Sequence, residues 1–144
     1  MDTLSPDTRD LIQAMEYRIQ EAKTDSAKAE ELKKLSGSWY DLGLHHLAGL
    51  YAERVAQTTP ADSTWAMAGT TYSLAIRNMK DPELVDFSAK RARHAFEQAI
   101  SLDPDEVRHR MNLALTYTMR PESGDPMKGV RMLVDLNRKH PDNV

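Results

Sequence analysis

The chain has 144 residues, 40% of them hydrophobic and 28% charged, which supports one folded domain rather than a disordered or fibrous chain. It carries 19 Lys and Arg against 22 Asp and Glu, and this net charge of −3 argues against bulk binding of nucleic acid. The lack of cysteine excludes disulfide scaffolds, thiolate zinc sites and cysteine nucleophiles, and leaves the redox compartment open.

The N-terminal residues, Met1 to Pro6, have neither the basic start nor the apolar stretch of a secretory signal. Nowhere in the chain do about eighteen apolar residues follow one another, as a membrane-spanning helix requires. We therefore expect a soluble protein that does not bind membranes. Its expected location is the cytoplasm, unless an export signal has been removed from the sequence.

Long stretches of helix-forming residues, interrupted by only 6 glycines and by no alternating β-branched run, predict an all-α protein. In chain order, the seven expected helices cover residues 6–22, 26–42, 45–58, 62–79, 82–102, 105–119 and 126–139. Ser5, Asp81 and Asp125 each precede a proline, a pattern that predicts helix N-caps at these three positions.

The first expected helix is amphipathic. Leu11, Ile12, Met15 and Ile19 share one stripe, and charged residues occupy the remaining surface. This pattern predicts a helix that packs through one face against the part of the chain that follows.

A recurring register relates three blocks of the chain, which end at Pro60, Pro104 and Pro141. Counting back five, eight and twelve residues from these prolines gives Val55, Ala99 and Leu136, then Ala52, Phe96 and Leu133, then Ala48, Ala92 and Gly129. The second block is preceded by Trp65-x-x-Ala68-Gly69-x-x-Tyr72, and the third by Arg110-x-x-Leu113-Ala114-x-x-Tyr117. One template of two helices per block fits these positions.

This template resembles the tetratricopeptide repeat (TPR), a helical hairpin with W-x2-L-G-x2-Y in its first helix and A-x3-F, then Pro, around its second. The matching residues are Trp65, Gly69 and Tyr72 in the first half, and Ala92, Phe96, Ala99 and Pro104 in the second. The resemblance covers about three quarters of the chain.

The resemblance implies an α-solenoid of about three TPR-like hairpins, preceded by a capping helix. The implied boundaries are 1–24 for the capping helix, 25–61 for a degenerate first repeat with a turn at Gly43, 62–106 for the second and 107–144 for the third. We expect long connections between the helices of repeats two and three, around 79–81 and 120–125.

Close packing of paired helices requires small residues where the backbones approach and large residues beside them. The predicted small positions are Ala48, Gly69, Ala92, Ala114 and Gly129. The predicted large ones, which fill the space alongside and toward the next repeat, are Trp39, Tyr72, Phe96 and Tyr117.

Catalytic motifs are scarce, so we expect neither an enzyme nor a metal or cofactor site. The sequence has no glycine-rich phosphate loop, no G-x-S-x-G and no H-E-x-x-H. Glu106-x-x-His109 is a single carboxylate–imidazole pair, whereas a di-iron bundle needs two such pairs and two further Glu. We expect Glu106 and His109 to lie at a solvated helix end, and His45 and His46 to form a polar turn.

Basic residues recur at two places that would meet between repeats two and three: Lys90, Arg91, Arg93 and His94, and Arg108, His109 and Arg110. An anionic ligand there is conceivable, but Arg91 and Arg93 point in different directions on a helix and acidic residues surround them. We expect a diluted patch that does not bind nucleic acid.

In the TPR family the first helices line a concave face that holds a peptide or a partner helix. Transferred to this sequence, the candidate groove residues are Lys33, Tyr40, Thr70, Ser73, Arg108, Met111 and Leu115. The carboxylate clamp of some family members is broken here, because Gly37, Met67 and Asn112 replace residues of that motif.

The function that the resemblance implies is a non-catalytic module that binds a protein or peptide in this groove. The alternative is a structural or self-associating subunit, such as a homodimer, that docks through the open C-terminal end of the array. A third reading also remains, in which the groove is only solvated helix surface.

Overall fold

A computed structural model describes residues 4–142, and in this range the chain forms seven α-helices. They are α1 (Pro6–Glu21), α2 (Asp25–Asp41), α3 (His45–Thr58), α4 (Asp62–Asn78), α5 (Pro82–Leu102), α6 (Val107–Met119) and α7 (Lys128–Lys139). The described residues contain no strand, only an isolated bridge between Glu122 and Asp125. The predicted all-α class is confirmed, and every helix begins and ends within two residues of its expected bounds.

Two of the three predicted N-caps are confirmed. Ser5 Oγ accepts a hydrogen bond from the Thr8 N–H at 3.2 Å, and Asp81 Oδ1 accepts one from the Glu83 N–H at 3.0 Å. The third is wrong, because α7 begins two residues late, after Met127, and has no side-chain cap. Asp125 instead bonds to Arg131 of the first turns of α7.

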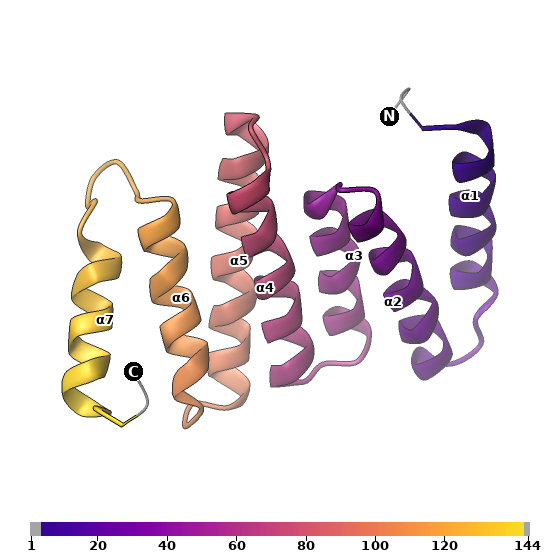
Figure 1. Ribbon diagram of the computed structural model, residues 1–144. Coiled ribbons are helices and arrows are strands. Elements are labelled where there is room, and N and C mark those ends of the chain that lie inside the picture. Colours follow the sequence, from indigo (N-terminus) through magenta and orange to yellow (C-terminus); the bar gives the residue numbers. More distant parts are fainter. Residues whose placement is uncertain (1–3, 143–144) are drawn as a thin grey trace.

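Each helix packs against the next one in the chain, so the helices follow one another side by side (Figure 1). Contacts that skip one helix join α3 to α5 and α4 to α6. The hydrophobic core therefore extends along the series of helices as successive clusters. One hydrophobic cluster joins α1, α2 and α3, a second joins α3, α4 and α5, and a third extends from α4 through α5 and α6.

The helices α3, α5 and α7 end in the same way. Thr59, Asp103 and His140 follow their last residues with φ between −128° and −140° and ψ between 65° and 83°. A proline comes next in each case, and it disfavours the α-helical conformation of the residue before it. The N–H groups of the three capping residues bond to the carbonyl oxygens of Val55, Ala99 and Leu136, all buried, at 2.8–2.9 Å. The proline register found in the sequence is therefore a register of helix ends.

The small residues lie where helices approach closely, as predicted. A Cβ on Gly69 of α4 would come within 2.6 Å of the Phe96 ring, and one on Gly129 of α7 within 2.7 Å of the Ala114 carbonyl oxygen. Ala48, Ala92 and Ala114 are fully buried. The predicted large residues, Trp39, Tyr72, Phe96 and Tyr117, are all buried beside them.

Sequence patterns missed one such approach and misplaced other features. A Cβ on Gly49 would come within 2.5 Å of the Tyr72 ring, so α3 and α4 also depend on a glycine. Leu11, assigned to the packing stripe of α1, is 49% exposed, whereas Ile12 and Ile19 are buried.

The connection between α4 and α5 is three residues long, no longer than the one between α2 and α3. The segment 62–106 is long because α5 itself is long, with 21 residues. The connection between α6 and α7, residues 120–127, is long as predicted. None of the helices in residues 4–142 has the length and apolar character needed to cross a membrane.

Candidate functional site

A small pocket lies between α4 and α6, and it brings together three of the predicted groove residues. Thr70 and Ser73 of α4 line one side, and Leu115 of α6 lines the other. The pocket has a volume of about 100 Å³ and its lining is completed by Leu74, Arg77, Phe96, Asn112 and Met119. Because α4 and α6 are in direct contact, these side chains form one continuous surface.

Arg108 and Met111 line a second hollow, of about 500 Å³, at the start of α6. Glu106, the N-cap of that helix, accepts hydrogen bonds from both the backbone N–H of Arg108, at 3.0 Å, and its guanidinium, at 2.9 Å. These bonds to Arg108 lower the pKa of Glu106 to about 2. The carboxylate therefore stays charged and neutralises the cation that sequence analysis offered to a ligand.

The other two candidates, Lys33 and Tyr40, lie on α2, which does not contact α4 in the described part of the chain. Lys33 Nζ is bound to Glu30 at 3.1 Å, so its charge is also compensated. Tyr40 is 47% exposed and its ring meets that of His45 edge to face, with 5.0 Å between centroids. The structure thus brings five of the seven candidates to α4 and α6 and leaves these two apart.

Arg77, at the end of α4, is a lining residue that sequence analysis missed. Its Nε lies 3.3 Å from the sulfur of Met119 on α6, and no carboxylate of residues 4–142 is within ion-pair distance. It lies four residues after Ser73, one helical turn on, and this spacing could have identified it. Arg77 is therefore the cation of the α4–α6 pocket that remains available to a ligand.

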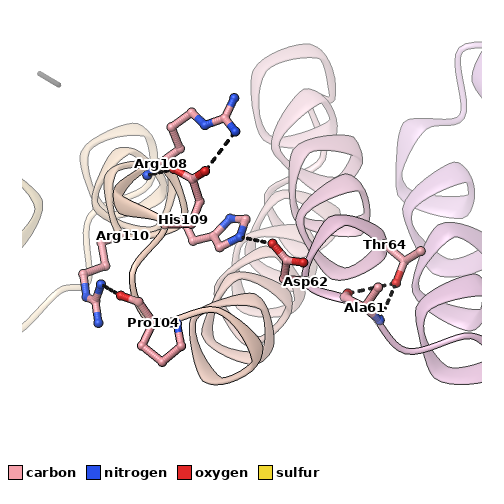
Figure 2. A network of polar contacts seen from close by, with 8 residues as sticks. Ala61, Asp62, Thr64, Pro104, Arg108, His109 and Arg110 are labelled. Carbon is pink, nitrogen blue, oxygen red and sulfur yellow. Dashed lines mark hydrogen bonds and ion pairs between the residues drawn. The ribbon is translucent and has the colours of Figure 1, made fainter.

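His109 is buried, contrary to the prediction of a solvated helix end. Its side chain is 8% exposed, and Nε2 lies 2.9 Å from Asp62 Oδ2 (Figure 2). Asp62 begins α4 and His109 lies in the first turn of α6, so the contact joins the two helices that form the pocket. The start of α4 is further fixed by Thr64, whose hydroxyl accepts from the Ala61 N–H at 3.1 Å.

The basic residues are dispersed among acidic ones, in keeping with the diluted patch that we expected: Lys90, Arg93 and His94 line one hollow together with Asp86, Glu97 and Glu122, and the other basic residues turn elsewhere. His109 turns to Asp62, Arg110 bonds to the carbonyl oxygen of Pro104, and Arg91 binds the buried carboxylate of Glu53 on α3. Arg93 donates to the carbonyl oxygens of Thr116 and Arg120 and stacks on the Tyr117 ring, with 4.2 Å from its Cζ to the centroid. Arg93 thereby caps the C-terminal end of α6, where a cation is stabilised by the helix dipole.

His45 and His46 begin α3 and are partly buried. His46 Nδ1 lies 3.1 Å from the Met79 sulfur, and burial, together with the neighbouring His45, lowers the pKa of His46. Within residues 4–142 no three His, Asp or Glu side chains are grouped as a metal ion would require.

Comparison with known proteins adds no assignment. No model of a known protein family matches the chain, and no curated protein is similar to it in sequence.

Proposed function

We propose that this protein is a non-catalytic interaction module, an α-solenoid of about three TPR-like hairpins with an N-terminal capping helix. Three observations support this architecture: the sequential packing of the helices, the common ending of α3, α5 and α7, and the glycine and alanine contacts between them. In such an array each unit contacts only its neighbours, and one face remains open along its length.

The proposed binding surface is the face formed by α4 and α6, and the ligand is an extended peptide or a partner segment. The observation that carries this proposal is the pocket in which Thr70, Ser73 and Leu115 meet the uncompensated Arg77 and the amide of Asn112. A volume of about 100 Å³ accommodates one side chain rather than a whole small molecule, for which pockets of about 300–1,000 Å³ are usual. A preformed surface of packed helices costs little conformational entropy on binding.

A peptide library displayed against the immobilised protein tests this function. Peptides that it enriches should bind the unmodified protein and lose about tenfold or more in affinity when Leu115→Arg or Thr70→Trp fills the pocket. Tyr17→Arg, at an exposed position of α1, is the matched control and should leave affinity unchanged. Enriched peptides that bind all four proteins equally would contradict the assignment to this face.

The ion pairs of Lys33 and Arg108 allow a second test of the proposed binding surface. Lys33→Glu with Arg108→Glu should change the affinity for an acidic peptide less than Arg77→Glu alone, because Glu30 and Glu106 already compensate Lys33 and Arg108. The opposite order of effects would move the binding site away from the α4–α6 pocket.

A second function is supported by the outer surface of α7. Met127, Val130 and Val134 are 53%, 41% and 53% exposed, so three apolar residues at helical spacing form one apolar stripe on the surface. The protein would then act as a structural or assembly subunit that docks through this end. Light scattering of the protein alone at high concentration tests whether such docking includes self-association.

A further inference from the structure

The apolar surface of α7 is wider than the surface that its neighbour covers. In residues 4–142 the helix packs only against α6, and it buries only Gly129 and Leu136. Val130 and Val134 are exposed, and Met127 continues the same stripe one turn earlier, since the three are spaced by three and four residues. This part of the apolar surface of α7 therefore faces away from α6.

Charge on α7 indicates what this surface fits. The helix carries Lys128, Arg131, Arg138 and Lys139 but only one carboxylate, Asp135, although the whole chain has a net charge of −3. Arg131 and Arg138 lie four residues after Met127 and Val134, so they border the exposed stripe. Arg138 has no carboxylate within ion-pair distance among the described residues, whereas Arg131 bonds to Asp125. The surface is apolar with a basic edge.

A second copy of the chain fits this surface poorly. Two α7 helices packed antiparallel through this stripe would bring their basic edges to the same side, which is unfavourable. The α1 end of another copy offers Leu11 and Tyr17 as exposed apolar side chains, but these are six residues apart and lie on different faces of that helix. Neither pairing would cover the stripe and also satisfy the arginines.

We propose that α7 docks an acidic amphipathic helix of another protein. Apolar side chains of that helix, spaced by three and four residues, cover Met127, Val130 and Val134, while its carboxylates face Arg131 and Arg138. The proposal rests on the second function above, docking through α7, and adds the chemistry of the partner.

A synthetic peptide of three heptads, with leucine on one face and glutamate elsewhere, is the probe. Fluorescence anisotropy should show saturable binding that weakens with added salt. Val130→Glu with Val134→Glu should weaken it by about tenfold or more, and Arg138→Glu by several-fold. All three side chains are exposed, so circular dichroism should show unchanged folding. Tyr17→Glu is the matched control on α1 and should bind like the unmodified protein.

The proposal is overturned if a scrambled peptide of the same composition, or one with lysine in place of glutamate, binds as well as the probe. It is also overturned if the probe does not bind, or binds the Val130→Glu, Val134→Glu variant equally. A doubled mass in light scattering that this double variant abolishes, without probe binding, would retain docking through α7 but make the occupant a second copy. No probe binding and no change of mass would reject both. Loss of probe binding in Leu115→Arg would assign the peptide to the α4–α6 pocket instead.

Discussion

The carboxylate of Glu53, on α3, is bound by the guanidinium of Arg91, on α5. Nε of Arg91 donates to Oε1 at 3.0 Å, and a second bond joins Nη2 to Oε2. Glu53 is 1% exposed, so this ion pair fixes one charged position within an apolar contact between two helices that are not neighbours in the chain. The attraction within such a buried pair is offset in part by the cost of removing both charges from water.

Removing Arg91 should destabilise the protein, because Glu53 would keep its buried charge without a cation, and only the Gln57 amide, at 3.4 Å, would still donate a hydrogen bond to it. For Arg91→Ala we expect a loss of about 2 kcal/mol in the free energy of unfolding, less than the ~3–5 kcal/mol of a fully buried pair, since the Arg91 side chain is 39% exposed. Urea unfolding measures this. The double variant Glu53→Leu, Arg91→Leu should be more stable than Arg91→Ala alone, and an equal or greater loss would contradict the account.

Tyr72 should make stability depend on alkaline pH. Its pKa is raised, first by burial and then by the Glu53 carboxylate. Above about pH 10 the unfolded chain loses the phenolic proton while the folded chain keeps it. The contribution of Tyr72 to the free energy of unfolding is therefore fully present below about pH 10. Above that pH the contribution falls by up to about 1.4 kcal/mol per pH unit. Tyr72→Phe, which keeps the ring, should flatten the curve of unfolding free energy against pH. Parallel curves for the two proteins would refute this.

Two glycines in helix interiors should respond to alanine with opposite signs. Gly69→Ala places a Cβ 2.6 Å from the buried Phe96 ring, and overpacking of about 1–3 kcal/mol outweighs the gain of about 1 kcal/mol in helix propensity. Gly37→Ala meets no atom within 4 Å and should stabilise by about 0.5–1 kcal/mol. Thermal melts of both variants provide the comparison. A melting temperature raised by both substitutions would show that α4 and α5 can separate to admit the methyl group.

The contact between Asp62 and His109 should contribute to stability through the buried imidazole. In Asp62→Ala, Nε2 of His109 loses its partner, and Nδ1 already lies buried without one within the described chain. We expect a cost of about 1–3 kcal/mol. Asp25→Ala is the matched control, because Asp25 also begins a helix but is exposed. Chemical denaturation should show a larger loss in the free energy of unfolding for Asp62→Ala than for Asp25→Ala. Equal losses would mean that Asp62 acts only as a negative charge at the start of its helix.

The sequence by itself determined the helices, their order and most of the positions at which they pack closely, with Gly49 as the exception. Periodic apolar residues specify helices, and the prolines at 60, 104 and 141 mark where α3, α5 and α7 end, because a proline disfavours the helical conformation of the residue before it. These signals are local, so they can be read without knowledge of the fold.

Only the tertiary structure decided which polar side chains meet. Glu53 and Arg91 are 38 residues apart and Asp62 and His109 are 47 apart, and neither pair has a spacing that a helix makes predictable. The same holds for the pocket between α4 and α6, where Arg77 joins residues of another helix. Such contacts depend on how the helices are rotated and offset against one another, which is set by the packing of whole surfaces and not by any local pattern.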